Sequence, residues 1–173
     1  MTMTTARAED DGNRALVGDL HEQRGPELYG FARRLGLSPD TAADAVQESL
    51  LRLWATLDSG ASVARPDAWL FRALYRICMD HHRWSRRASG LVARLLSRPT
   101  APPETPIADR LTVWDAVDRL PERQRLIVYL RYRADLPYVE IGSVLGINPV
   151  SARSQISRAL DRLGELLSRE DFR

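Results

Sequence analysis

The spacing of apolar residues predicts helices along the chain, and it is most informative over residues 136–163. There it predicts a short helix, a tight turn and a second helix. Gly146 is suited to end the first of these helices, because glycine adopts the left-handed backbone conformation at no steric cost. Asn148 and Pro149 then supply an N-cap and a first helical residue. A buried stripe on the second helix is predicted for Ala152, Ile156, Ala159, Leu160 and Leu163.

The outer face and flanks of this second helix carry small polar residues and arginines. Such side chains suit a DNA major groove, because arginine binds guanine or phosphate and serine allows the backbones to approach closely. An ordinary antiparallel helix pair with a solvated outer face would have the same spacing, so that interpretation stays open. The residues expected to meet DNA are Asn148, Val150, Ser151, Arg153, Ser154, Ser157 and Arg158.

The same analysis predicts an all-α protein with two small helical domains, at residues 14–88 and 109–173. Helices are predicted over residues 16–35, 39–57, 66–87, 109–120 and 122–133, with an interruption of the first at Gly25-Pro26. Residues 1–13 are polar and are predicted to form a disordered tail. Residues 89–108 are predicted to be a Pro-rich linker with at most a short helix over residues 91–96, because four prolines prevent regular structure beyond it.

The predicted helix over residues 39–57 has two distinct faces. One is apolar, and the other carries Asp44, Gln47, Glu48 and Arg52. A solvated charged face is the ordinary interpretation of such a pattern. The alternative is a docking face for a basic partner helix.

The net charge is only +2, but the charged residues are distributed unevenly along the chain. Residues 1–64 hold six arginines against ten acidic residues, whereas residues 65–98 hold eight arginines against two acids. This basic block includes the segment RICMDHHRWSRR, in which arginines surround Trp84. Such a segment suits melted nucleic acid, with charge for phosphate and a flat ring for an exposed base. Trp84 in a core beside solvated arginines would fit the pattern equally well.

Composition excludes several other classes of protein. No apolar run approaches the ~20 residues that a membrane span needs, and the N-terminus lacks the apolar segment of a secretory signal. Cys78 is the only cysteine, so we expect a reducing, cytoplasmic setting. Cys78, His81 and His82 do not have the spacing of zinc ligands, and neither a metal nor another cofactor is predicted.

Three motifs in order resemble the extracytoplasmic-function class of bacterial RNA polymerase sigma factors. The segment DAVQESLLRLW (residues 44–54) resembles the polymerase-docking helix of that family. AWLFRALYRICMDHHRWSRR (residues 68–87) resembles the helix that recognises and melts the −10 element. LPERQR (residues 120–125) followed by the helix–turn–helix is similar to the −35-binding domain. The resemblance covers nearly everything except the tail and the linker.

The resemblance implies a role for each matching residue. The first domain would be region 2-like and the second region 4-like, and contact with the polymerase would involve the coiled coil of its largest subunit and its flap. The loop over residues 58–65 would hold a flipped −10 base. Polymerase-binding residues would be Asp44, Gln47, Glu48, Leu51, Arg52 and Trp54. Residues for the −10 element would be Ser59, Ser62, Arg65, Arg76, Asp80, Arg83, Trp84, Arg86 and Arg87.

The expected function is therefore that of an alternative sigma factor without catalysis of its own, covered by an anti-sigma factor until a signal arrives. In the free protein the two domains are expected to pack together and to hide Arg153 and Arg158. A stand-alone helix–turn–helix regulator is the alternative, although it leaves residues 44–54 unexplained. A nucleic-acid enzyme would need clustered carboxylates or a metal site, and the sequence offers neither.

Overall fold

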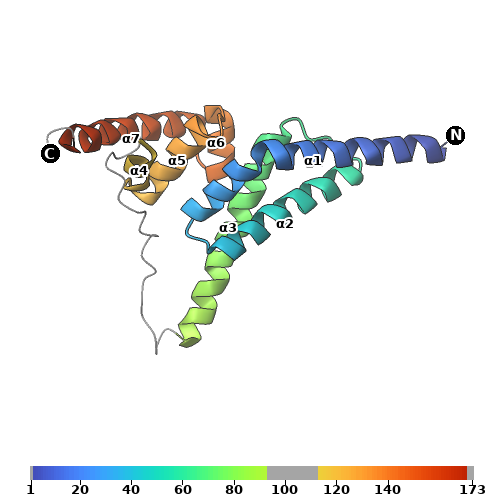
Figure 1. Ribbon diagram of the computed structural model, residues 1–173, viewed down its shortest axis with the longest axis horizontal. Coiled ribbons are helices and arrows are strands. Elements are labelled where there is room, and N and C mark those ends of the chain that lie inside the picture. Colours follow the sequence, from blue (N-terminus) through green and yellow to red (C-terminus); the bar gives the residue numbers. More distant parts are fainter. Residues whose placement is uncertain (1, 93–112, 171–173) are drawn as a thin grey trace.

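The computed structural model describes the backbone of residues 2–92 and 113–170 and the side chains of residues 11–85 and 113–168. Within these ranges every regular element is a helix, which confirms the all-α prediction (Figure 1). The helices are α1 (Thr2–Arg34), α2 (Pro39–Asp58), α3 (Pro66–Val92), α4 (Val113–Asp118), α5 (Glu122–Tyr132), α6 (Tyr138–Leu145) and α7 (Pro149–Glu170).

Helix α1 differs from its prediction in two respects. It begins at Thr2, so helix replaces the expected disordered tail, and it continues through Pro26 without the expected interruption. Residues 6–9 are Ala-Arg-Ala-Glu, all good helix formers, and no proline precedes position 26. Pro26 removes one backbone donor but leaves the helix continuous, and α1 bends part-way along its length (Figure 1).

The first domain is a bundle of α1, α2 and α3. Ser38 caps α2, since its Oγ accepts a hydrogen bond from the Thr41 backbone N–H at 3.2 Å. Phe31 of α1 and Phe71 of α3 meet edge to face at 5.6 Å between ring centroids and are fully buried. Burying each such side chain contributes ~1.5–3 kcal/mol, so this aromatic pair is a main source of bundle stability.

The second domain is formed by α4 to α7. Gly146 ends α6 in the left-handed conformation with φ 67°, and the Ile147 N–H donates to the Gly142 carbonyl at 3.0 Å. Asn148 caps α7 through a 2.7 Å bond from the Ser151 N–H to its Oδ1, as predicted. The predicted stripe of α7 is buried except at Leu160, which is 39% exposed.

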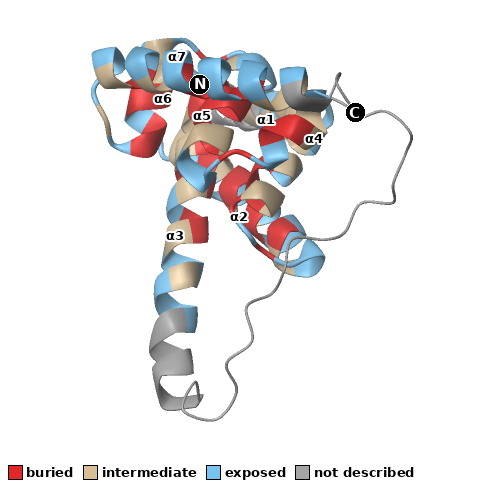
Figure 2. Cartoon of the chain, turned by 90° about the vertical axis from the view of Figure 1, so that its left-hand side faces the viewer, coloured by how far each residue is buried: buried red, intermediate tan, exposed pale blue. Residues whose placement is uncertain are grey.

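The two domains pack against each other, as expected for the free protein. Helix α1 contacts α5, helix α3 contacts α6, and their buried residues form one continuous apolar cluster. The expectation that packing would hide Arg153 and Arg158 is wrong, because both residues are exposed. The second domain uses α4, α5 and α6 for this contact, which leaves the outer face of α7 in solvent (Figure 2).

The predicted linker lies largely outside the described residues. Helix α3 continues to Val92, beyond the predicted end at residue 87, and residues 93–112 are not described. The short helix expected over residues 91–96 and the beginning of the helix expected from residue 109 therefore fall mostly in that gap. Where the structure is described, no helix is both long and apolar enough to span a bilayer.

Gly142 permits a close backbone approach in the turn between α6 and α7. A Cβ at this position would lie 2.5 Å from the Ile147 carbonyl oxygen, a backbone atom that cannot move freely. We expect Gly142→Ala to lower the free energy of unfolding by ~1–3 kcal/mol in chemical denaturation. Gly164→Ala is the matched control, because its Cβ would meet nothing and the change should be neutral or stabilising by up to ~1 kcal/mol. Equal stability of the two variants would contradict this role of Gly142.

Cys78 is a core residue of α3 and has no exposed surface. Burial raises the pKa of its thiol to about 12, so the reactive thiolate is scarce at pH 8. We expect a thiol reagent to label the native protein very slowly and the denatured protein promptly, with one equivalent per chain. Prompt stoichiometric labelling of the native protein would show that α3 is packed differently.

Candidate functional site

The outer face of α2 presents the predicted polymerase-binding residues together. Asp44, Gln47 and Arg52 are exposed, and Leu51 is 64% exposed although it is apolar. Glu48 is half-buried and pairs with Arg52 one turn along the helix. These side chains project away from the bundle core, so a partner can reach them without any change in the fold.

An apolar hollow of about 300 Å³ lies beside this face, between α1 and α2. It is lined by Arg14, Val17, Leu50, Leu51 and Trp54. The half-buried Trp54 has its indole N–H buried without an acceptor. Val17 was not among the predicted residues, although apolar residues at 16, 17 and 20 of an otherwise polar stretch are a signal for this contact.

The loop between α2 and α3 carries Ser59, Ser62 and Arg65, all exposed. The Ser59 hydroxyl donates to the Thr56 carbonyl at 2.7 Å, and Arg65 donates to both oxygens of Asp67, at 3.2 and 3.0 Å. The hydrogen bond from Arg65 is the main reason that the pKa of the Asp67 carboxyl lies below its ordinary value. Two of the three predicted side chains are therefore held by local contacts, while no described contact involves the Ser62 side chain.

A hollow of about 350 Å³ opens on this loop. Its walls are formed by the end of α2, the loop and the beginning of α3, and by one residue of the second domain, Glu140 of α6. Sequence analysis did not associate Glu140 with this loop, because the two are far apart along the chain. Only the packing of the domains brings them together.

The later part of α3 presents further predicted residues to solvent. Arg76, Asp80, Arg83 and Trp84 are exposed, and Arg83 donates to Asp80 at 3.1 Å. Trp84 is 71% exposed, so of the two interpretations of this residue the core position is wrong. Helix α3 continues through Arg86 and Arg87, but their side chains lie outside the described residues.

The two histidines of α3 lie in different settings. His82 is hydrogen-bonded to the Leu35 carbonyl at 2.7 Å and so ties α3 to the end of α1, whereas His81 is exposed. With Cys78 in the core, these three residues do not converge. In the described ranges no group of histidine, cysteine and acidic side chains is arranged to hold a metal ion.

The predicted DNA-binding face of α7 is accessible over most of its length. Arg153, Ser154, Ser157 and Arg158 are exposed, and Arg158 donates to the Ser154 hydroxyl at 3.0 Å. Val150 is 78% exposed at the beginning of the helix. The two remaining members are more restricted: Ser151 is half-buried, and the amide oxygen of Asn148 is occupied by its capping bond.

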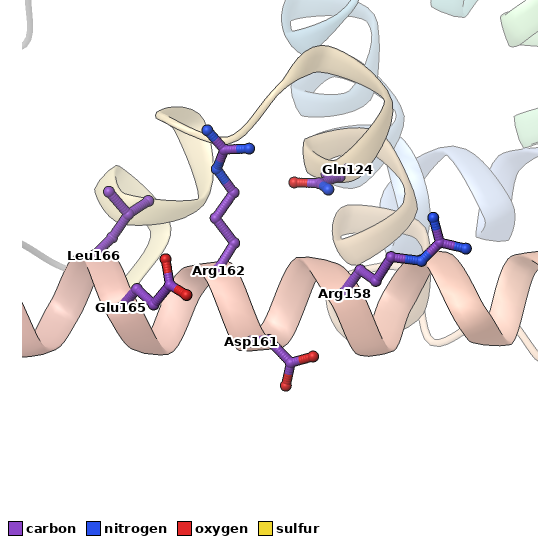
Figure 3. A pocket seen from close by; sticks show the side chains of 6 residues that line it. All are labelled: Gln124, Arg158, Asp161, Arg162, Glu165 and Leu166. Carbon is purple, nitrogen blue, oxygen red and sulfur yellow. The ribbon is translucent and has the colours of Figure 1, made fainter.

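Helix α5 adds residues to this face that sequence analysis missed. Pro121, Arg123 and Gln124 line one hollow of about 770 Å³ together with Val150, Ser151, Ser154, Gln155 and Arg158. In a neighbouring hollow Arg162 and Gln124 point toward each other across the space between α7 and α5, while Asp161 points away (Figure 3). The cluster of arginines in the segment ERQR at the beginning of α5 is the signal that could have identified these residues.

Comparison with known proteins agrees with this geometry. The family described as Sigma-70 region 2 matches residues 20–88, and the family described as Sigma-70, region 4 matches residues 110–163. The ECF RNA polymerase sigma factor EcfG of Rhodopseudomonas palustris (strain TIE-1) is 32% identical over 154 residues, covering 85% of this chain and 84% of that protein. SigL of Mycobacterium tuberculosis is 30% identical over 155 residues, covering 86% and 87%.

Two solved structures have a similar fold. The sigma factor RpoE of Bartonella quintana, in complex with the anti-sigma factor NepR, is 27% identical with a TM-score of 0.63 and covers 87% of this chain and 97% of its own. CnrH, in complex with the cytosolic domain of CnrY, is 25% identical with a TM-score of 0.58 and covers 94% of both chains. The resemblance inferred from three motifs is thus confirmed: the chain belongs to the ECF class of RNA polymerase sigma factors, which have no enzymatic activity of their own.

Proposed function

We propose that this sigma factor uses three separate surfaces, one for core RNA polymerase and two for the promoter. The observation that carries the proposal is the simultaneous exposure of the α2 face, the α3 face and the α7 face in one folded chain. Each surface holds one set of the residues assigned by family resemblance. A protein that only binds an operator would need the α7 face and would have no use for the other two.

The polymerase is proposed to bind the outer face of α2 and the adjacent apolar hollow. A helix of the coiled coil in its largest subunit would place apolar side chains against Leu51 and Trp54 and basic side chains near Asp44 and Glu48. Leu51 supports this assignment, because an apolar residue at 64% exposure gains burial only from a partner. A second contact, from the flap of the polymerase, is proposed for the second domain.

The −10 element is proposed to bind along the 59–65 loop and the exposed side of α3. A flipped base costs a few kcal/mol of unstacking, which stacking on aromatic side chains and contacts to phosphate can offset. Trp84 provides an accessible ring, and Arg76 and Arg83 provide charge beside it. Arg86 and Arg87 remain assigned to this surface by family resemblance.

The −35 element is proposed to bind the exposed face of α7. Arg153 and Arg158 would contact guanine or phosphate, with Ser154 and Ser157 allowing close approach. Arg123 of α5 lies beside this face and would add a phosphate contact. Since arginine–phosphate contacts release counterions, DNA binding should weaken steeply as salt is raised.

Control by an anti-sigma factor is also proposed. Two structural neighbours were each solved as a complex, one of them with a named anti-sigma factor. A protein of this kind would act in the cytoplasm, where promoter DNA and polymerase are found. The apolar hollow beside α2 is a surface that such an inhibitor would compete for.

The direct test is run-off transcription with purified core polymerase and a library of promoter sequences. We expect transcripts that begin at a shared −35/−10 sequence and that depend on this chain. Specific DNA binding without polymerase, together with no promoter-specific transcript from folded protein, would favour the stand-alone regulator instead.

Paired substitutions should separate the polymerase surface from the −35 surface. Gln47→Ala combined with Glu48→Ala should weaken binding to core polymerase by about ten-fold or more, in line with losing more than 1.4 kcal/mol, and should leave duplex −35 binding unchanged. The matched control is Glu22→Ala with Gln23→Ala, an exposed pair of the same residue types on α1.

The reciprocal pair is Arg153→Ala with Arg158→Ala. It should abolish specific −35 binding and lower the salt dependence by about two phosphate equivalents at most, while polymerase binding persists. Equal loss of both activities in either pair would show that the two surfaces are misassigned. Both measurements use fluorescence anisotropy on the full chain, with circular dichroism to verify folding.

A further inference from the structure

A hollow of about 270 Å³ lies between α2 and α3, on the flank of α2 away from the apolar hollow beside α1. It is lined by Glu48 and Arg52 of α2 and by Ile77, Asp80, His81 and Trp84 of α3. Family resemblance assigned the two α2 residues to the polymerase and assigned Asp80 and Trp84 to the −10 element. The structure brings both pairs together on one surface.

Trp84 does not share a side of α3 with the arginines assigned to nucleic acid. At 3.6 residues per turn, Arg72, Arg76 and Arg83 fall within about 40° of one another around the helix. Trp84 follows Arg83 directly, so these two side chains point about 100° apart. It falls instead about 20° from Ile77, a buried residue of the hollow. Trp84 is therefore turned toward α2, whereas Arg72 lines the separate hollow beside the α2–α3 loop.

The ring of Trp84 is available to a partner. It is 71% exposed, and no ring stacking or cation–π contact involves it in the described part of the chain. Burying a tryptophan removes a large apolar area from water, and tryptophan is among the residues that contribute most to protein–protein interfaces. An uncovered indole beside docking residues of α2 is therefore a candidate anchor.

The carboxylates of this hollow can accept further hydrogen bonds. Glu48 accepts from Arg52 through Oε1, and Asp80 accepts from Arg83 through Oδ1 at 3.1 Å. Each of these bonds uses one carboxylate oxygen, so the second oxygen of each acid can accept from an incoming donor. Both are surface pairs, for which exchange of an intrahelical partner has little cost. The same oxygens would repel the phosphates of a nucleic acid.

We propose that this hollow extends the polymerase surface from α2 onto α3, with Trp84 as the anchor for a basic side chain of the polymerase. The extension rests on the docking already proposed for α2. An arginine or lysine entering the hollow would lie against the Trp84 ring and donate to Glu48 and Asp80. A cation over a tryptophan face contributes most where water is excluded, and a partner helix lying on α2 would exclude it. The −10 strand is the less favoured occupant, because its phosphates would meet two carboxylates.

The hollows on the two flanks of α2 differ in chemistry, and this difference orients the partner. Leu50 and Trp54 line the apolar hollow toward α1, whereas Glu48 and Arg52 line the hollow toward α3. A helix lying across α2 would place apolar side chains on the α1 side and a basic side chain on the α3 side. The docking helix of the polymerase is thus expected to have one apolar edge and one basic edge.

The test measures affinity for purified core polymerase without DNA, by competition of each unlabelled full-length variant against the fluorescent wild type. Trp84→Ala should weaken binding about ten-fold or more, as expected for an anchoring tryptophan. Trp84→Phe should lose less affinity than Trp84→Leu, because a phenyl ring retains part of the cation–π contact. Tyr29→Ala is the matched control, since it removes an exposed aromatic ring from α1 and should leave binding unchanged.

Charge reversal tests the sign of the partner. Asp80→Lys should weaken binding to the polymerase several-fold, and more strongly at low salt, because it places like charges together. Asp19→Lys makes the same change in net charge at an exposed position of α1 and should have no effect. An affinity for the polymerase that Asp80→Lys leaves unchanged or raises would overturn the proposal.

Nucleic acid as the occupant is tested by the anisotropy of a fluorescent pool of random single-stranded DNA. Loss of strand binding by Trp84→Ala, with wild-type affinity for the polymerase, would assign the hollow to nucleic acid and overturn the proposal.

Leu51→Ala separates this result from a failure of the docking proposed for α2. If Leu51→Ala weakens polymerase binding while Trp84→Ala and Asp80→Lys do not, only the extension onto α3 fails. If none of the three variants weakens it, the docking on α2 fails as well. Circular dichroism verifies that each variant is folded.

Discussion

Helix α5 must bury apolar side chains against both domains at once, and the rest of the structure depends on that constraint. Its residues Leu126 to Leu130 are all buried, because α5 packs on α6 and α7 within its own domain and on α1 of the other. A helix that is apolar on all sides needs neighbours on all sides. In the packed protein those neighbours are supplied by both domains, so the second domain cannot leave without exposing the Tyr129 ring to water or to a new partner.

This constraint explains why some faces of the helices are exposed to solvent while others are covered by the opposite domain. Contacts between the domains use α4, α5 and α6, which places Glu140 of α6 at the hollow beside the loop that precedes α3 and leaves the outer faces of α2 and α7 in solvent. Both of these outer faces are therefore accessible while the domains are packed together.

Within each domain, most of the fold followed from local patterns in the sequence. The Asn148 cap, the Gly146 stop and the apolar face of α2 are determined by neighbours along the chain, and they were predicted correctly. The candidate residues chosen by family resemblance lie on accessible faces where their side chains are described, with Asn148 and Ser151 the more restricted members. Arg86 and Arg87 lie where side chains are not described.

What the sequence could not predict depends on contacts between distant segments. Tyr129 falls outside the regular stripe of α5, so nothing local indicates that it packs on Phe31. The position of Glu140 beside the loop over residues 59–65 depends on how one domain packs on the other. The helical N-terminus and the uninterrupted passage through Pro26 were missed for a different reason, because polarity and a single proline were given more weight than helix propensity.

The buried position of Cys78 has a consequence for how this sigma factor could respond to oxidants. Oxidants and disulfide partners act on accessible thiolates, and the sole sulfhydryl of this chain is neither ionised at neutral pH nor within reach of a reagent. Oxidation of a cysteine thiol is therefore not a direct route by which redox stress could act on the folded protein. A thiol-based sensor for the genes that this protein serves would have to be located on another molecule.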